Sequence, residues 1–234
     1  YARGSPGLGS KSRGSKAGCM NPDRYSIGEE IAHAVTHGVG LLLSIGGLAV
    51  LVAFSSLYGD AWHITSTSIY GATLILLYAA STLYHGIPHA GAKEVLQRLD
   101  HAAIFLLIAG TYTPFTLVSL RGSWGWTLFG LVWGIAIAGM VLELACRKRY
   151  KRLSITLYLG LGWLVLIAIK PMLTSVEAGG LVLLLAGGLC YSFGVIFYVW
   201  KRLTYHHAIW HLFVLAGSAL HFFSVLFYVV PPGA

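Results

Sequence analysis

The last apolar stretch of the chain decides how the rest of the sequence is interpreted. Residues 204–230 read TYHHAIWHLFVLAGSALHFFSVLFYVV, and a helix of this length crosses the roughly 30 Å hydrocarbon core of a bilayer. His207 and His211 open the stretch, and a spacing of four places both imidazoles on one helix face. Two such nitrogens make half of a tetrahedral zinc site. Because ionisable groups in spanning helices are costly and mark functional sites, we expect other segments to supply the remaining ligands.

Composition classifies the chain as a membrane protein. Of its 234 residues, 56% are hydrophobic and 10% are charged, whereas soluble domains carry about 25% charged residues. Apolar runs recur along the sequence, which predicts an all-α membrane protein built as a seven-transmembrane helix bundle. Pro114 predicts a kink in the third run, and Pro171 predicts the end of the fifth. The predicted spans cover residues 29–57, 62–85, 100–120, 124–145, 153–170, 179–201 and 207–230.

The N-terminal residues differ from everything that follows them. The first nineteen read YARGSPGLGSKSRGSKAGC, a composition without apolar periodicity that predicts disorder. They lack the apolar core of a signal peptide, and Met20 is a natural start. We therefore interpret residues 1–19 as a disordered, vector-derived expression tag and residues 20–234 as one seven-transmembrane domain.

Basic residues are unevenly divided between the two ends of the predicted spans. From Met20 onward only Arg121 and Lys170 fall on one side. Cytoplasmic loops carry the excess of Lys and Arg, so the N-terminus is predicted to lie inside and the C-terminus outside. We read the net charge of +8 as a topology signal rather than as nucleic-acid binding, because no basic patch is interleaved with exposed aromatics. The basic residues of the other side are Arg24, Lys93, Arg98, Arg147, Lys148, Arg149, Lys151, Arg152, Lys201 and Arg202.

This topology brings four polar side chains to one depth. The second span ends at His85, the third begins at Asp100, and the seventh begins with His207 and His211, all on the inner side. Three neutral imidazoles and one water form a catalytic zinc arrangement, in which zinc lowers the pKa of the water to about 7. Asp100 is then placed to orient or deprotonate that water. Ser81, one turn before His85, is placed to hydrogen-bond the water or a substrate oxygen.

Each of these residues also has a purely structural interpretation. Asp100 is a suitable N-cap for the third span, since aspartate favours that position and the helix dipole. Ser81 is equally suited to helix packing, and a lone histidine such as His85 is often interfacial. Only the joint placement of these residues favours a metal site over these alternatives.

Other histidines compete for the same role. His33 and His37 are also four residues apart and lie near the inner end of the first span. The sequence leaves open what these two residues and Glu30 do. His221 lies ten residues beyond His211, about 15 Å along a helix, so we expect it to hydrogen-bond within the bundle instead of joining the metal.

The motifs together resemble a known family. The pattern Ser81-x3-His85, then Asp100, then His207-x3-His211 is similar to that of the progestin and adipoQ receptor family. The runs STLYHGIPH, LLIAGTYTPF and HHAIWH resemble its bacterial branch, the haemolysin III proteins, and the resemblance covers essentially residues 20–234. It implies zinc bound by His85, His207 and His211, with Asp100 and Ser81 contacting the zinc water. It also implies a multi-pass protein of the bacterial inner (plasma) membrane.

The resemblance points to function at membrane lipids. The family is similar to alkaline ceramidases, which implies zinc-dependent hydrolysis of a ceramide-like lipid amide or ester, and its bacterial members imply a role in lipid and fluidity homeostasis. Membrane lipids are then the expected partners, with the oligomeric state left open. Two alternatives remain at this point: a non-enzymatic membrane sensor with a structural zinc, and a haemolysin-type pore or transporter.

Overall fold

The computed structural model describes residues 1, 25–145 and 151–231. All regular elements in this part of the chain are helical, and 7 helical stretches are long and apolar enough to cross a membrane. The predicted seven-span, all-α architecture is therefore confirmed. The stretch interpreted as an expression tag lies, apart from Tyr1, outside the described residues.

The helices follow one another with short connections. They are α1 (Ile27–Tyr58), α2 (Ala61–Gly86), α3 (Ala90–Pro114) with the π-helical turn η1 (Phe115–Ser119), α4 (Ser123–Ala145), α5 (Lys151–Gly162), the 3-10 segment η2 (Trp163–Ala168), α6 (Ile169–Ser175), α7 (Ala178–Val199) and α8 (His206–Tyr228).

Local sequence explains where α1 and α2 begin. Ser26 and Glu29 form a capping box, in which the serine hydroxyl accepts from the Glu29 amide and the Glu29 carboxylate accepts from the Ser26 amide. The Asp60 carboxylate caps α2 by accepting from the amides of Trp62 and His63. Hydrogen bonding, chiefly with the His63 side chain, lowers the pKa of Asp60. The tight connection at Asp60 makes α1 and α2 antiparallel neighbours.

The third span begins earlier than the hydropathy pattern predicts. α3 starts at Ala90, and the side chain of His89 caps it by accepting from the Ala92 amide. Asp100 therefore lies well inside the helix, and the alternative in which it caps the third span is wrong. Residues 90–99 contain charged side chains such as Lys93 and Glu94, which lower the hydropathy of the segment although these residue types favour helix formation.

The fifth span is a composite of α5, η2 and α6. It continues past Pro171, so the predicted end is wrong: Pro171 is the third residue of α6, and a first helical turn tolerates proline. At the break between α5 and η2, the Tyr112 hydroxyl of α3 lies 3.0 Å and 2.8 Å from the carbonyl oxygens of Leu161 and Gly162 and accepts from the Val165 amide. Backbone groups inside a membrane need such partners, and α3 provides them here.

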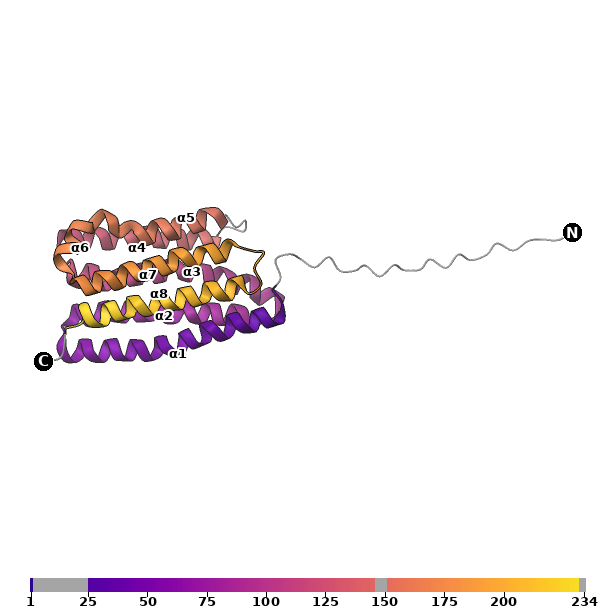
Figure 1. Ribbon diagram of the computed structural model, residues 1–234, viewed down its shortest axis with the longest axis horizontal. Helices are drawn as coiled ribbons and strands as arrows, with labels where there is room; N and C mark the ends of the chain where they lie inside the picture. Colours follow the sequence, from indigo (N-terminus) through magenta and orange to yellow (C-terminus); the bar gives the residue numbers. More distant parts are fainter. Residues whose placement is uncertain (2–24, 146–150, 232–234) are drawn as a thin grey trace.

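The helices are arranged around α3 and α7 (Figure 1). On one side lie α1, α2 and α8, with α1 packed against both of the others; on the opposite side lie α4, α5 and α6. At one end of the bundle α1 and α8 begin and α2 finishes. Three segments that are far apart in sequence therefore meet at that end.

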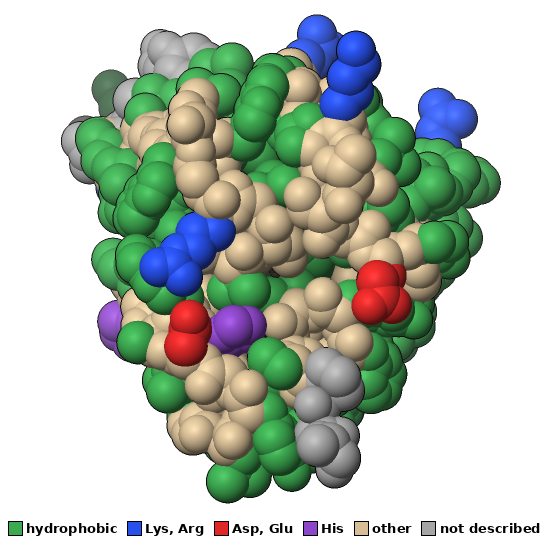
Figure 2. Space-filling model, turned by 90° about the vertical axis from the view of Figure 1, so that its left-hand side faces the viewer, with side chains coloured by type: hydrophobic (Ala, Val, Ile, Leu, Met, Phe, Trp, Pro, Cys, Tyr) green, Lys and Arg blue, Asp and Glu red, His purple; other side chains and the backbone are tan. Residues whose placement is uncertain are grey.

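The surface of the bundle suits a lipid environment. Large apolar side chains such as Leu42 and Leu57 of α1 are exposed along the outside of the helices. Figure 2 shows the end of the bundle at which the C-terminus lies, where a small number of Lys, Arg, Asp and Glu side chains lie among hydrophobic and uncharged groups. The chain is a multi-pass membrane protein, while the predicted orientation of its termini stays a prediction.

Candidate metal centre

Three histidines from two distant helices meet at the end where α1 and α8 begin. His85 lies in the last turn of α2, and His207 and His211 lie one turn apart at the start of α8. All three are buried, and one ligand nitrogen from each lies within 4.8 Å of those from the other two. Separations of this size bring three imidazoles to one ion with only small side-chain adjustments.

The polar atoms of this cluster fit a bound metal ion. Nε2 of His85 and both ring nitrogens of His207 are buried without a hydrogen-bond partner in the described part of the chain. Leaving a polar group buried and unpaired costs about 1–3 kcal/mol. A divalent ion would satisfy the unprotonated nitrogens, so the residues present match an imidazole-ligated metal.

Ser81 and Asp100 line a cavity that also reaches two of the three histidines. Both residues line this cavity together with His207 and His211. The Ser81 hydroxyl is buried without a partner among the described residues, one turn before His85 on α2. Asp100 reaches the cavity from α3, and its side chain is buried. The structure thus brings all five predicted site residues to the same end of the bundle.

The cavity itself is mainly apolar. It has a volume of about 370 Å³ and extends from the polar head to Met172 in α6. Its walls come from α3, α5, α7 and α8, with residues such as Ile104, Leu159 and Leu184. Small-molecule sites combine an apolar lining with a few convergent polar groups, and this cavity has that character.

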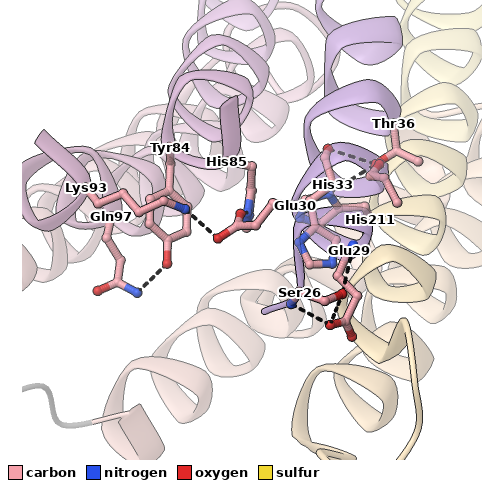
Figure 3. Close-up of polar contacts among 11 residues, drawn as sticks. Ser26, Glu29, Glu30, His33, Thr36, Tyr84, His85, Lys93, Gln97 and His211 are labelled. Carbon is pink, nitrogen blue, oxygen red and sulfur yellow. Dashed lines mark hydrogen bonds and ion pairs between the residues drawn. The ribbon is translucent and has the colours of Figure 1, made fainter. Parts of the chain in front are cut away.

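Glu30 of α1 fixes the orientation of His85. Nδ1 of His85 lies 2.7 Å from Oε2 of Glu30, and Lys93 donates to the other oxygen, Oε1 (Figure 3). A carboxylate can only accept from a protonated ring nitrogen, so Nδ1 carries the proton and Nε2 keeps the lone pair. Metal-ligating histidines commonly donate their second N–H in this way.

α1 orients His211 in a similar manner. Nδ1 of His211 lies 3.3 Å from the carbonyl oxygen of His33 and 3.2 Å from the hydroxyl of Thr36. The Thr36 hydroxyl donates to the carbonyls of Ala32 and His33, so its oxygen accepts from His211. Nδ1 is again the protonated nitrogen, which leaves Nε2 of His211 as the ligand atom.

Sequence reasoning missed these orienting residues. It noted His33 and His37 as a second pair and left Glu30 without a role. The side chain of His37 stacks on His211 with ring centroids 3.5 Å apart and planes 10° apart. The sequence signal that could have pointed to Glu30 is its position one turn before His33. Its partner on α2, His85, can be identified only in the folded chain.

Tyr25 covers the histidines from the segment before α1. Its ring centroid lies 4.7 Å from that of His33 and 5.3 Å from that of His207. Burial raises the pKa of Tyr25, so its hydroxyl stays protonated at neutral pH. The tyrosine separates the cluster from solvent without adding a charge.

The remaining histidines lie outside this cluster. The predicted hydrogen bond of His221 within the bundle is confirmed, since its Nε2 donates to the Leu184 carbonyl at 3.0 Å. His206 uses Nδ1 to donate to the Phe197 carbonyl. His101 lies 3.6 Å from Glu143 of α4, and His63 contacts Asp60 at the opposite end of the bundle.

Comparison with known proteins gives consistent matches. A family model described as haemolysin-III related matches residues 25–222. The hemolysin-3 homolog of Bacillus subtilis (strain 168) is 52% identical over 206 residues, covering 88% of this chain and 97% of its own. Hemolysin-3 of Bacillus cereus is 48% identical over 205 residues, covering 88% and 94%. The human monocyte to macrophage differentiation factor is 28% identical over 198 residues, covering 81% and 80%.

Proposed function

Because the chain belongs to the haemolysin-III-related family of multi-pass membrane proteins, we propose that it is a zinc-dependent hydrolase of lipid amides or esters in the bacterial inner membrane. One observation carries this proposal: Ser81, Asp100 and two histidines of the three-imidazole cluster line the same apolar cavity. The ligands proposed for zinc are His85, His207 and His211.

Each residue of the cluster has a role in this proposal. Zinc bound by three imidazoles supplies a Lewis acid and a water of lowered pKa. Asp100 accepts a proton from the attacking water and returns it to the leaving nitrogen or oxygen. The Ser81 hydroxyl, which has no other partner in the described chain, donates to the carbonyl oxygen on which negative charge develops. Both residues stand at the cavity head, where a carbonyl group would lie.

The cavity supports a lipid as substrate. Its walls are apolar over most of their length, and Asp100 is the only carboxylate or cationic side chain among its described lining residues. An acyl chain fits such a lining, with its polar linkage held at the histidine end. The scarcity of charged side chains in the described lining argues against an ion pore, because many selectivity filters are built from rings of charged side chains.

A non-enzymatic role for the same zinc is the second candidate. The ligands come from α2 and α8, and the residues that orient them come from α1. An ion at this position would hold three helices together at one end of the bundle. In that case zinc is structural, and the physical state of the bilayer changes how the helices pack instead of changing the rate of a reaction.

Metal analysis and lipid turnover separate these functions. In nanodiscs we expect about one zinc ion per chain in the wild type, and loss of it in His211→Ala. The control is His206→Asn, a buried histidine outside the cluster, which keeps its zinc. Asp100→Asn should keep zinc and release fatty acid from ceramide-type amides or acyl esters about 10²–10⁴-fold more slowly.

Each result has a defined meaning for the proposal. Equal zinc in the wild type and in His211→Ala would refute the site. Zinc binding without turnover of any lipid amide or ester, combined with a lower melting temperature after chelation, would establish the structural role instead. Ion flux through liposomes carrying the protein would favour a pore.

A further inference from the structure

A second group of metal-binding side chains adjoins the first and shares His85 with it. One ligand atom from each of Glu30, His33 and His85 lies within 4.8 Å of those from the other two. Glu30 and His33 are one turn apart on α1, and His85 is in the last turn of α2. The two groups therefore meet at a single imidazole.

The ring nitrogens of His33 have no hydrogen-bond partner in the described chain that accounts for the burial of this side chain. Its side chain is 0% exposed, and neither ring nitrogen has a hydrogen-bond partner in residues 25–145 and 151–231. Its ring centroid lies 4.6 Å from that of His85 and 4.8 Å from that of His207. A buried imidazole without hydrogen bonds is costly. A metal ion that contacts His33, even transiently, gives this side chain a function.

Burial makes an entry path necessary for the first group. His207 and His211 are buried, whereas the Glu30 side chain is 22% exposed at the helix end. Glu30 is thus the most exposed of these side chains, so an ion arriving from solvent at this point would meet its carboxylate before the buried histidines. A workable metal site needs such a path.

The proton on His85 argues against two ions bound at once. Nδ1 of His85 faces Glu30, and Nε2 has no partner in the described chain. A neutral imidazole has its lone pair on only one of these two nitrogens, so it binds one ion at a time. The two groups are therefore alternative positions of a single ion. Lys93 occupies the other oxygen of Glu30 and reduces the negative charge that this carboxylate offers. The outer position is consequently weak, which favours onward movement of the ion.

We propose that Glu30, His33 and His85 form a transit position through which a divalent metal ion reaches His85, His207 and His211. The proposal rests on the zinc site of the proposed function. At the outer position the ion binds Nδ1 of His85, beside Glu30 and His33, and the ring proton resides on Nε2. At the inner position the ion binds Nε2 of His85 and the two histidines of α8, and the proton returns to Nδ1 by exchange with water. His33 thus acts on the rate of metal exchange and not on the final affinity.

Metal uptake by the apoprotein tests this assignment without a lipid substrate. Full-length apoprotein in detergent is mixed with Co²⁺ or Zn²⁺, and both the rate and the final stoichiometry are measured. His33→Asn should slow uptake about tenfold or more, which corresponds to about 1.4 kcal/mol in the barrier. Extraction by a chelator should slow by the same factor, because the dissociation constant is the ratio of the two rates.

Two further variants serve as controls. His206→Asn replaces a buried histidine that belongs to neither group, and its uptake rate should equal that of the wild type. His33→Cys restores a metal ligand and should restore fast uptake. Equal melting temperatures of the apoproteins show that the variants are folded.

The outcomes distinguish this proposal from the zinc site on which it rests. Unchanged uptake in His33→Asn, with a full final complement of metal, overturns the transit position and leaves the zinc site intact. Loss of the bound metal in His33→Asn makes His33 a permanent ligand and also overturns it. If the wild type binds a second equivalent of metal that His33→Asn does not bind, the two groups are separate sites and the transit position is overturned. No binding by the wild type refutes both proposals.

Discussion

Oε2 of Glu30 on α1 lies 2.7 Å from Nδ1 of His85 on α2. This contact joins two helices and fixes which nitrogen of His85 carries the proton. It also connects a partly exposed carboxylate to a buried imidazole, with Lys93 on the other carboxylate oxygen. The proposed metal centre is therefore organised by α1, although α1 supplies none of the three histidines assigned to zinc.

Glu30→Gln should weaken zinc binding. Loss of a carboxylate that orients a ligating histidine costs about 10–100-fold in metal affinity. Equilibrium competition with a zinc chelator measures this effect. Glu29→Gln is the matched control, since Glu29 caps α1 through Ser26 and is outside both metal-binding groups. Equal affinities of the Glu30→Gln variant and the wild type would show that His85 does not need this carboxylate.

Thr36→Val should have a smaller effect on the same affinity. It removes one acceptor of the His211 Nδ1 proton and leaves the His33 carbonyl as the other. One neutral hydrogen bond contributes about 0.5–1.5 kcal/mol, so we expect a loss of about two- to tenfold. Thr82→Val is the control, because within the described residues the Thr82 hydroxyl donates to the backbone carbonyl of Tyr78 in its own helix. A loss equal to that of Thr82→Val would contradict an orienting role.

Ser218→Ala should destabilise the helix bundle. The hydroxyl of Ser218 in α8 is bonded by the hydroxyls of Tyr78 in α2 and Tyr191 in α7. Its removal leaves both tyrosines in need of a partner, at about 1–3 kcal/mol for an unsatisfied group. Thermal unfolding in detergent should show a larger fall in melting temperature than for Ser224→Ala, whose hydroxyl donates to the Gly180 carbonyl and has no second partner among the described residues. Equal melting temperatures of the two variants would refute this.

The end of the bundle with the histidines should face the cytoplasm. In a chain with Cys19, Cys146 and Cys190 replaced by serine, Lys201→Cys is expected to react with an impermeant thiol reagent only in inverted vesicles. Arg121→Cys, at the opposite end, should react in intact cells. Both positions are exposed, and both basic side chains lie over an aromatic ring. The reverse labelling pattern would overturn the orientation inferred from the basic residues.

Hydropathy predicted the seven spans because each helix must be apolar along its length to cross a bilayer. It failed where a helix extends beyond the apolar region or changes its geometry. The first turns of α3 contain Lys93 and Glu94, so the pattern placed the helix start too late. The fifth span continues through η2 and Pro171. At its break between α5 and η2, the Tyr112 hydroxyl of α3 accepts from the Val165 amide. Neither the early start of α3 nor the break in the fifth span can be recognised from the pattern of apolar residues around it.

The sequence by itself determined the number of spans, and the alternation of spans placed His85, Asp100, His207 and His211 at one end of the bundle. This follows because consecutive spanning helices run in opposite directions. Only the tertiary structure decided which side chains at that end face one another. Glu30, His33 and Thr36 join the cluster because α1 packs against both α2 and α8. Contacts between helices that are distant in sequence depend on helix rotation and packing, which apolar patterning alone does not specify.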